Sequence, residues 1–164
     1  QSKNLYTVDD LDNALHAMQD KIDTLKKSAS AKQSRIKEVN ELLRMVDYYK
    51  SGKPAADKLK SIRFEKSRQK YKAEHDDELR TFYMAERKLK PHFKDGKLPI
   101  TAWRRECEQL EQEYRDIQSE LLPLHADAKK LWAIHYNIYE VQHEQERQNA
   151  ATRQKKQEIE HLFE

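Results

Sequence analysis

The sequence predicts an all-α protein built on a long antiparallel helical hairpin, a coiled coil capped by a small helical insert. Between residues 8 and 49, apolar residues recur at alternating steps of three and four, which is the pattern of a coiled-coil seam. The same alternation returns between residues 103 and 138, so a second long helix can lie along the first. The chain is 37% charged, has two Gly and four Pro, and contains no run typical of a strand.

The first long helix is expected to start after Thr7, whose side chain can cap it. Asp9 and Asp10 follow in the first turn, where carboxylates complement the helix dipole. At ~1.5 Å per residue, the stretch from 8 to 49 would be roughly 60 Å long. Lys32 interrupts its seam among small residues, which predicts a weak point between residues 26 and 34. The apolar seam residues are Val8, Leu11, Leu15, Met18, Ile22, Leu25, Ala29, Ile36, Val39, Leu43 and Val46.

The insert is expected to begin at Ser51-Gly52-Lys53-Pro54. Gly52 suits the position just past a helix end, and Pro54 suits the first turn of the next helix. Two shorter helices are predicted between residues 55 and 89, the second opening with the acidic run 74–78. A turn containing Asp95-Gly96 is expected between residues 91 and 99.

The second long helix is expected to begin near Ala102, with Thr101 as its cap. Pro123 lies inside it and predicts a kink, because proline removes one backbone hydrogen bond and crowds the preceding turn. Beyond Ile138 the seam becomes polar, and the tail is expected to stay helical. The seam residues are Trp103, Cys107, Leu110, Tyr114, Ile117, Leu121, Leu124, Ala128, Leu131, His135 and Ile138.

The two long helices have matched lengths, which favours a hairpin that pairs Tyr49 with Thr101 and sets Pro123 opposite Lys27. The chain then divides into a first arm (1–49), a basic helical cap (50–98), a second arm (99–141) and a polar helical tail (142–164). A three-helix bundle is the competing architecture. It needs an unbroken middle helix, and the uneven apolar spacing between Phe64 and Leu79 disfavours one.

The charge is concentrated in the cap. The whole chain has a net charge of +3, but between residues 50 and 72 nine Lys or Arg oppose only Asp57 and Glu65, a local balance of +7. Such a segment can neutralise phosphates, and Phe64 and Tyr71 within it can offer faces for stacking. The alternative interpretation is an ordinary solvated surface. The candidate nucleic-acid-binding residues are Lys58, Lys60, Arg63, Lys66, Arg68, Lys70 and Lys72.

No catalytic or metal-binding pattern is present in the sequence. None of the seven His stand four residues apart, the spacing that places two ligands on one helix face. His135 and His143 are eight residues apart, with Tyr139 between them, so they lie two helical turns apart and a structural role is favoured over metal binding. The acidic run 74–78 has two interpretations, a metal-binding cluster or the capped start of a helix, and the helix start is favoured. Cys107, the single cysteine, is expected to be a small buried hydrophobe. We therefore expect a chain that is not an enzyme and has no cofactor or bound metal.

The sequence shows no apolar stretch long enough to span a membrane and no signal peptide, which predicts a cytoplasmic protein without a membrane partner. It opens at Gln1 in a polar run without an initiator Met, so we expect a fragment or a processed product.

Four motifs follow one another between residues 23 and 141. They are the run 35–49, the segment 71–85 containing Tyr71-Lys72-Ala73-Glu74-His75, the turn Lys97-Leu98-Pro99, and 103–138 with Glu106, Leu110, Leu131 and Asn137. In their order and spacing these motifs resemble the C-terminal helical region of relaxases, the mobilisation nucleases of conjugative elements from Gram-positive bacteria. Pro123 and the Lys-rich stretch after Pro54 depart from the usual pattern.

The resemblance implies a parent protein that nicks one DNA strand through a catalytic tyrosine, with a histidine-bound metal, in a nuclease domain N-terminal to this region. No catalytic residue of that domain falls in this sequence. The resemblance therefore implies a non-catalytic accessory domain that contacts DNA and helps assemble the relaxosome, with DNA and transfer proteins as partners. The alternative is a structural coiled-coil module that forms a homodimer or docks a protein partner.

Overall fold

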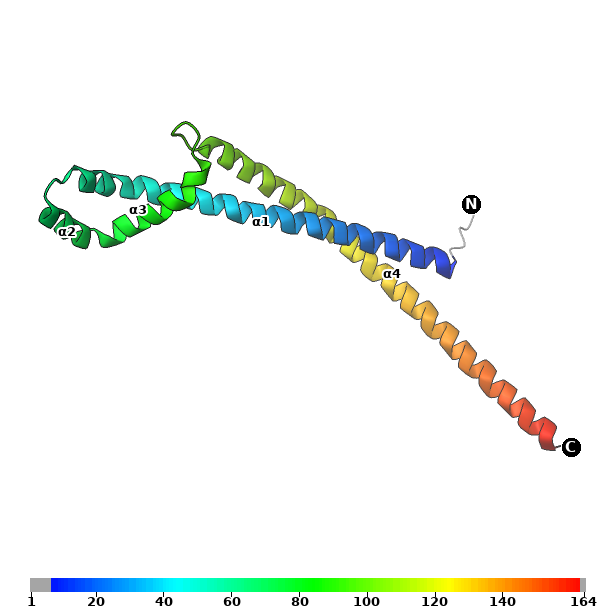
Figure 1. Cartoon of the computed structure of the whole chain (residues 1–164). Helices are drawn as coiled ribbons and strands as arrows, with labels where there is room; N and C mark the ends of the chain where they lie inside the picture. The colour runs from blue at the N-terminus through cyan, green and yellow to red at the C-terminus, as the bar shows by residue number, and fades with distance from the viewer. Residues whose placement is uncertain (1–6, 163–164) are drawn as a thin grey trace. The chain divides into compact units, whose positions relative to one another are not determined.

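The computed structural model describes residues 7–162, and this part of the chain is almost entirely helical (Figure 1). It contains four α-helices, one short 3₁₀ helix and no strand beyond an isolated bridge. The all-α class predicted from the sequence is confirmed. The elements are α1 (Val8–Ser61), α2 (Glu65–Glu74), α3 (Asp76–Leu89), η1 (Lys90–His92) and α4 (Ile100–Leu162).

The chain divides into two compact units. Among the described residues, unit 1 comprises 7–27 and 117–162, and unit 2 comprises 28–116. Helices α1 and α4 each contribute a segment to both units. Within each unit these segments pack against each other in opposite directions, as a helical hairpin requires.

In unit 1 the two helices enclose a small apolar cluster. Ile22 of α1 is buried against Leu121 and Ala128 of α4. Lys21 pairs with Glu120 at 3.2 Å, and Asp12 contacts His135 at 2.7 Å. Residue numbers thus fall along α1 while they rise along α4, which makes the pair antiparallel.

Unit 2 has a larger core because α3 adds a third wall to the hairpin. Val39 and Val46 of α1 are buried in one cluster with Leu89 of α3 and with Trp103 and Cys107 of α4. A second cluster joins the end of α1 to α3. Its buried members are Ala55, Ala56, Leu59, Leu79 and Phe82.

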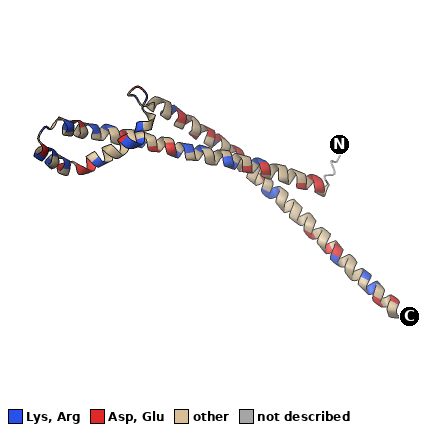
Figure 2. Ribbon diagram, viewed as in Figure 1, with Lys and Arg blue, Asp and Glu red and all other residues tan. Residues whose placement is uncertain are grey.

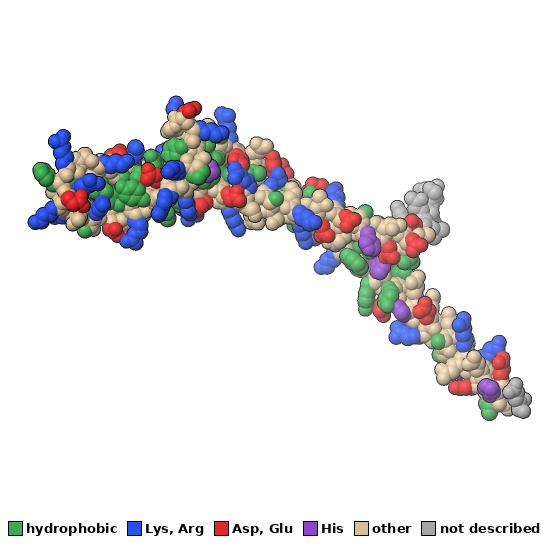
Figure 3. All heavy atoms as spheres, viewed as in Figure 1, with side chains coloured by type: hydrophobic (Ala, Val, Ile, Leu, Met, Phe, Trp, Pro, Cys, Tyr) green, Lys and Arg blue, Asp and Glu red, His purple; other side chains and the backbone are tan. Residues whose placement is uncertain are grey.

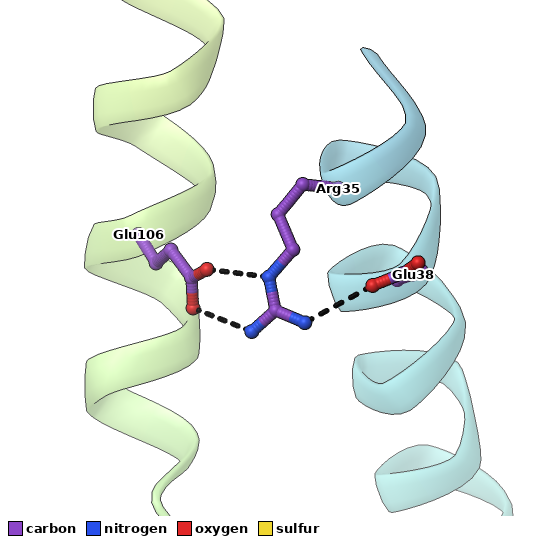
Figure 4. A network of polar contacts seen from close by, with 3 residues as sticks. All are labelled: Arg35, Glu38 and Glu106. Atoms are coloured by element: carbon purple, nitrogen blue, oxygen red, sulfur yellow. Dashed lines mark hydrogen bonds and ion pairs between the residues drawn. The ribbon is translucent and has the colours of Figure 1, made fainter. Parts of the chain in front are cut away.

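Polar contacts fix the hairpin of unit 2 on its flanks. The Arg35 guanidinium donates from Nε and one Nη to both carboxylate oxygens of Glu106, at 2.6 and 3.2 Å, and from its other Nη to Glu38 at 3.1 Å (Figure 4). Its pKa is raised above the ordinary value, chiefly by the hydrogen bonds to Glu106. Bidentate pairing is the strong form of an arginine–carboxylate contact, so this contact helps fix the register of α1 against α4.

The predicted seams are confirmed. All the apolar seam residues named above are buried or half-buried, on both helices. Lys32, the interruption in the first seam, is also half-buried, and its ammonium pairs with Glu113 of α4. The expected weak point is therefore bridged by an ion pair between the helices.

The predicted helix break at Ser51-Gly52-Lys53-Pro54 is wrong, because α1 continues through it to Ser61. Pro54 is exposed and cannot donate a backbone hydrogen bond, while Ala55, Ala56 and Leu59 beyond it are buried in the cluster shared with α3. That burial outweighs the local cost of the proline. The first short helix consequently starts at Glu65 instead of near residue 55.

The second short helix agrees with the prediction. Asp76, Asp77 and Glu78 occupy the first turn of α3. The acidic run is therefore a helix start, as one of its two interpretations required.

The caps of the long helices agree with the prediction at one end only. The Asp10 amide donates to Thr7 Oγ1 at 3.1 Å and the Thr7 amide donates to Asp10 Oδ2 at 2.9 Å, which confirms Thr7 as a cap. Thr101 is not a cap, because α4 already begins at Ile100. The Pro99 carbonyl instead accepts from the Trp103 amide at 3.0 Å.

The predicted turn before α4 is confirmed. Lys94 and Lys97 exchange backbone hydrogen bonds of 2.9 Å around Asp95 and Gly96, which both have positive φ (49° and 72°). Positive φ at both central positions is the geometry for which Asp-Gly is preferred.

The predicted register is wrong by three to nine residues, which is about one to two and a half helical turns. A pairing of Tyr49 with Thr101 would set Arg35 opposite residue 115, but Arg35 contacts Glu106. The prediction assumed that the turn lies directly at the ends of equal arms. Instead α1 runs to Ser61, and the packing of Trp103 against Val39 and Val46 sets where α4 lies.

The end of α4 agrees with the prediction of a helical tail. The helix runs through Pro123 to Leu162, and residues 144–162 are exposed on all sides. The kink expected at Pro123 stays a prediction.

Candidate nucleic-acid interface

All seven candidate binding residues lie in unit 2, around the connection between α1 and α2. Lys58 and Lys60 are in the last turn of α1, Arg63 lies in the connection, and the other four are in α2. Figure 2 shows Lys and Arg recurring along this end of α1 and along α2. The structure therefore brings the predicted residues onto adjoining elements.

Helix α2 is held to the rest of unit 2 by few contacts. None of its residues is buried. Tyr71 packs against the second cluster, and the Lys58 ammonium lies 5.5 Å from the centre of the Tyr71 ring. Lys58 is thus engaged in a cation–π contact that fixes α2 to α1.

Four of the seven cations are exposed and have neither an ion pair nor a cation–π contact in the part of the chain that the structure describes. Lys70 lies 4.0 Å from Glu74, at the limit of an ion pair, and both side chains are well exposed. Exposed cations without an intramolecular partner are available to an anionic ligand, because no internal contact has to be broken. The four are Lys60, Arg63, Lys66 and Lys72.

Arg68 differs from the other candidates because it is half-buried. Its Nε is buried and has no hydrogen-bond partner. This position is better placed to support α2 than to reach a ligand from solvent.

The cations of α2 do not form one stripe. Lys66 and Lys70 are four residues apart and share one face of the helix, and Arg68 and Lys72 share another. The space-filling view shows Lys and Arg side chains projecting in several directions around this end of unit 2 (Figure 3). The positive surface therefore faces solvent on more than one side.

The fold adds cations from α3 that the sequence reasoning missed. Lys72 lines an open groove of about 330 Å³ together with Arg80, Tyr83 and Arg87. Arg80 is paired with Asp76, whereas Arg87 is exposed. Arg80, Tyr83 and Arg87 are three and four residues apart, so they share one face of α3. This spacing is the signal in the sequence that could have placed the two arginines together. What could not be read from the sequence was that α2 would lie beside this face.

The two candidate stacking residues are placed differently. Tyr71 is half-buried and is occupied by Lys58 and by the His75 ring, 4.2 Å away. Phe64 is 78% exposed at the N-cap of α2 and makes no side-chain capping bond. Only Phe64 presents an unoccupied aromatic face.

The residues considered for chemistry have structural partners. Cys107 is buried, its Sγ lies 3.4 Å from Asn40 Oδ1, and burial raises its thiol pKa above the ordinary value. A raised pKa disfavours the reactive thiolate, which agrees with the predicted role as a small buried hydrophobe. His135 contacts Asp12, and the His143 ring lies 4.2 Å from Tyr139. Within residues 7–162, no group of three or more His, Cys, Asp or Glu side chains could hold a metal ion.

Comparison of the chain with protein-family models, with curated proteins and with solved structures finds no match. Among the described helices, none is both long and apolar enough to cross a membrane.

Proposed function

We propose that this chain is a non-catalytic accessory domain of a DNA relaxase, contributing DNA contact and relaxosome assembly during conjugative mobilisation. The resemblance of residues 23–141 to relaxase C-terminal regions motivates the choice of parent. The observation that supports DNA contact is the set of four exposed cations without ion pairs, Lys60, Arg63, Lys66 and Lys72, on α1, the connection and α2. Exposed cations without ion pairs also occur elsewhere in the described chain, but these four lie in a segment, 50–72, where nine Lys or Arg oppose only Asp57 and Glu65.

A charge-reversal variant tests this proposal. Replacing Lys60, Arg63 and Lys66 with Glu should abolish retention of a DNA duplex in a mobility-shift assay at low salt. For the unchanged chain, the affinity should fall steeply with salt, because each neutralised phosphate releases counterions. Replacing the same three residues with Gln removes three phosphate contacts without adding negative charge and should lower the slope of log K against log salt by about 3.

The matched control reverses three exposed lysines of unit 1, Lys129, Lys155 and Lys156, and so changes the net charge by the same amount. It should retain DNA nearly as well as the unchanged chain. Equal losses in both variants would mean that only total charge matters, and unchanged retention in the first variant would refute the assigned site.

A second candidate function is supported by a separate surface on α4. Five large apolar side chains between residues 132 and 141 are at least half exposed, which is unusual for a helix that already buries a seam. Three of them, Trp132, Tyr136 and Tyr139, are three or four residues apart and so share one helix face, which fits the alternative of a coiled-coil module that self-associates or docks a protein. The residues are Trp132, Ile134, Tyr136, Tyr139 and Val141.

Sedimentation at increasing protein concentration tests self-association. The mass should rise with concentration for the unchanged chain, and the Trp132→Ser and Tyr139→Ser double variant should remain monomeric. Leu122→Ser, at an exposed apolar position of α4 outside this face, is the control. If the unchanged chain is a monomer at all concentrations, self-association is wrong, and docking of a different protein is the remaining role for this face.

A further inference from the structure

Phe64 occupies a position that neither helix capping nor core packing explains. The N-cap of a helix favours Ser, Thr, Asp or Asn, whose side chains accept a bond from the first amides. Phe64 cannot do this, and no side-chain capping bond is made there. Its ring is 78% exposed, more than any other large hydrophobic residue of unit 2.

The surroundings of Phe64 are positively charged. Arg63 precedes it directly, and Lys60 and Lys66 lie within four residues on either side, against one carboxylate, Glu65, which follows it. These three cations are exposed, and they have no ion pair within residues 7–162. An apolar ring among unpaired cations matches a ligand that has planar apolar groups joined by anionic ones, which is the chemistry of a nucleic acid.

The state of the bases distinguishes two kinds of nucleic acid. In a duplex the base faces are stacked on one another, so a ring from the protein reaches them only by unstacking a step, at a cost of about a few kcal/mol. In a single strand the faces are accessible, and stacking on an aromatic side chain contributes about 1–3 kcal/mol per base. An exposed ring on a connection therefore favours unpaired bases.

We infer that Phe64 stacks on an unpaired base of a single-stranded nucleic acid whose phosphates are bound by Lys60, Arg63 and Lys66. This inference rests on the proposed DNA-contact function and deepens it, because it specifies the strand state that the basic end of unit 2 selects. Phosphate contacts alone would not discriminate between single and double strands.

The test compares Phe64→Leu with the unchanged chain by fluorescence anisotropy, using a labelled oligothymidylate of about 20 nucleotides and a labelled duplex of the same length. Leucine keeps an apolar side chain at an exposed position, so the fold should be retained, and circular dichroism checks this. The single-strand affinity should fall about tenfold, while the duplex affinity should change by less than about twofold. A ribonucleotide strand of the same length shows whether the sugar matters.

A gain-of-signal variant provides an independent readout. Tryptophan at this position, in Phe64→Trp, should be quenched and shielded from acrylamide when the oligothymidylate binds. The unchanged chain, with Trp103 buried in unit 2 and Trp132 in unit 1, should show little of this effect.

The outcomes separate the inference from the proposed function. If Phe64→Leu binds the single strand as well as the unchanged chain, while reversal of the three cations removes binding, the inference is wrong and DNA contact stands. If the unchanged chain binds neither the single strand nor the duplex, both the inference about Phe64 and the proposed DNA contact are wrong. If Phe64→Leu alters self-association in sedimentation but not oligonucleotide affinity, the ring is a protein contact and the inference is again wrong.

Discussion

At the scale of single residues, the sequence predicts a special role for Gly52 but gives the wrong reason for it, the end of a helix. A Cβ built at Gly52 would lie 2.6 Å from Phe82 Cβ and 3.2 Å from the Glu78 carbonyl oxygen. Glycine is present there because α1 and α3 approach closely, and not because a helix ends. The residue marks a helix contact.

Gly52→Ala should therefore destabilise the protein, although alanine is the better helix former by about 1 kcal/mol. Overpacking against the backbone of α3 should cost about 1–3 kcal/mol, so the net change should lower the urea midpoint measured by circular dichroism. Ser51→Ala, at the exposed neighbouring position of the same helix, is the control and should leave the midpoint nearly unchanged. A raised midpoint for Gly52→Ala would show that α3 can move away at little cost.

The Arg35–Glu106 pair allows a second test at this scale. A double-mutant cycle with Arg35→Gln and Glu106→Gln should give a coupling energy of about 0.5–1 kcal/mol, since the pair is bidentate but only partly shielded from solvent. The Arg44–Glu41 pair within α1 should give about 0.3 kcal/mol. Equal coupling energies in the two cycles would mean that the Arg35–Glu106 pair is no stronger than a pair within one helix and does not help fix the register of α1 against α4.

At the scale of elements, α1 shows that tertiary burial can carry a helix through two residues that usually end one. Beyond Pro54 the helix buries Ala55, Ala56 and Leu59 against α3, and helices in proteins obtain most of their stability from such packing. Pro54 itself is exposed and contributes no buried contact.

Pro54→Ala should consequently stabilise the protein. The substitution supplies an amide that can donate to the Lys50 carbonyl and relieves the crowding of that turn, and a gain of about 1–3 kcal/mol is expected. Thermal unfolding followed by circular dichroism measures it, with Pro99→Ala, outside any helix interior, as the comparison. An unchanged or lower melting temperature would indicate that this turn of α1 already departs from regular hydrogen bonding.

At the scale of the whole molecule, each unit contains one carboxylate whose pKa is lowered by folding. In unit 1 the Thr7 backbone and side-chain hydrogen bonds lower the pKa of Asp10. In unit 2 hydrogen bonds from Lys32, and then from Gln109, lower the pKa of Glu113. A lowered pKa means that the folded state binds the proton less readily than the unfolded state, so both groups stabilise the fold when ionised.

Both contributions should be fully present above about pH 5, where the carboxyls are ionised in the unfolded chain as well, and should be lost as the pH falls through the lowered pKa values of the folded state. Melting temperatures measured between about pH 6 and pH 2 should therefore drop for the unchanged chain. Asp10→Asn combined with Glu113→Gln should start lower and show a shallower drop. A double variant whose profile is as steep as that of the unchanged chain would place the acid sensitivity elsewhere.

The sequence by itself determined the helical class, both seams, the Thr7 cap, the Asp-Gly turn and the segment that contains the basic residues. These depend on local period, local hydrogen bonding or composition, all of which can be read along the chain. Only the tertiary structure decided where α1 ends, how α4 is set against it, and that Arg80 and Arg87 join Lys72 in one groove. The physical reason is that these features depend on burial between residues far apart in the chain, as when Phe82 approaches Gly52 or Trp103 is buried in the same cluster as Val39.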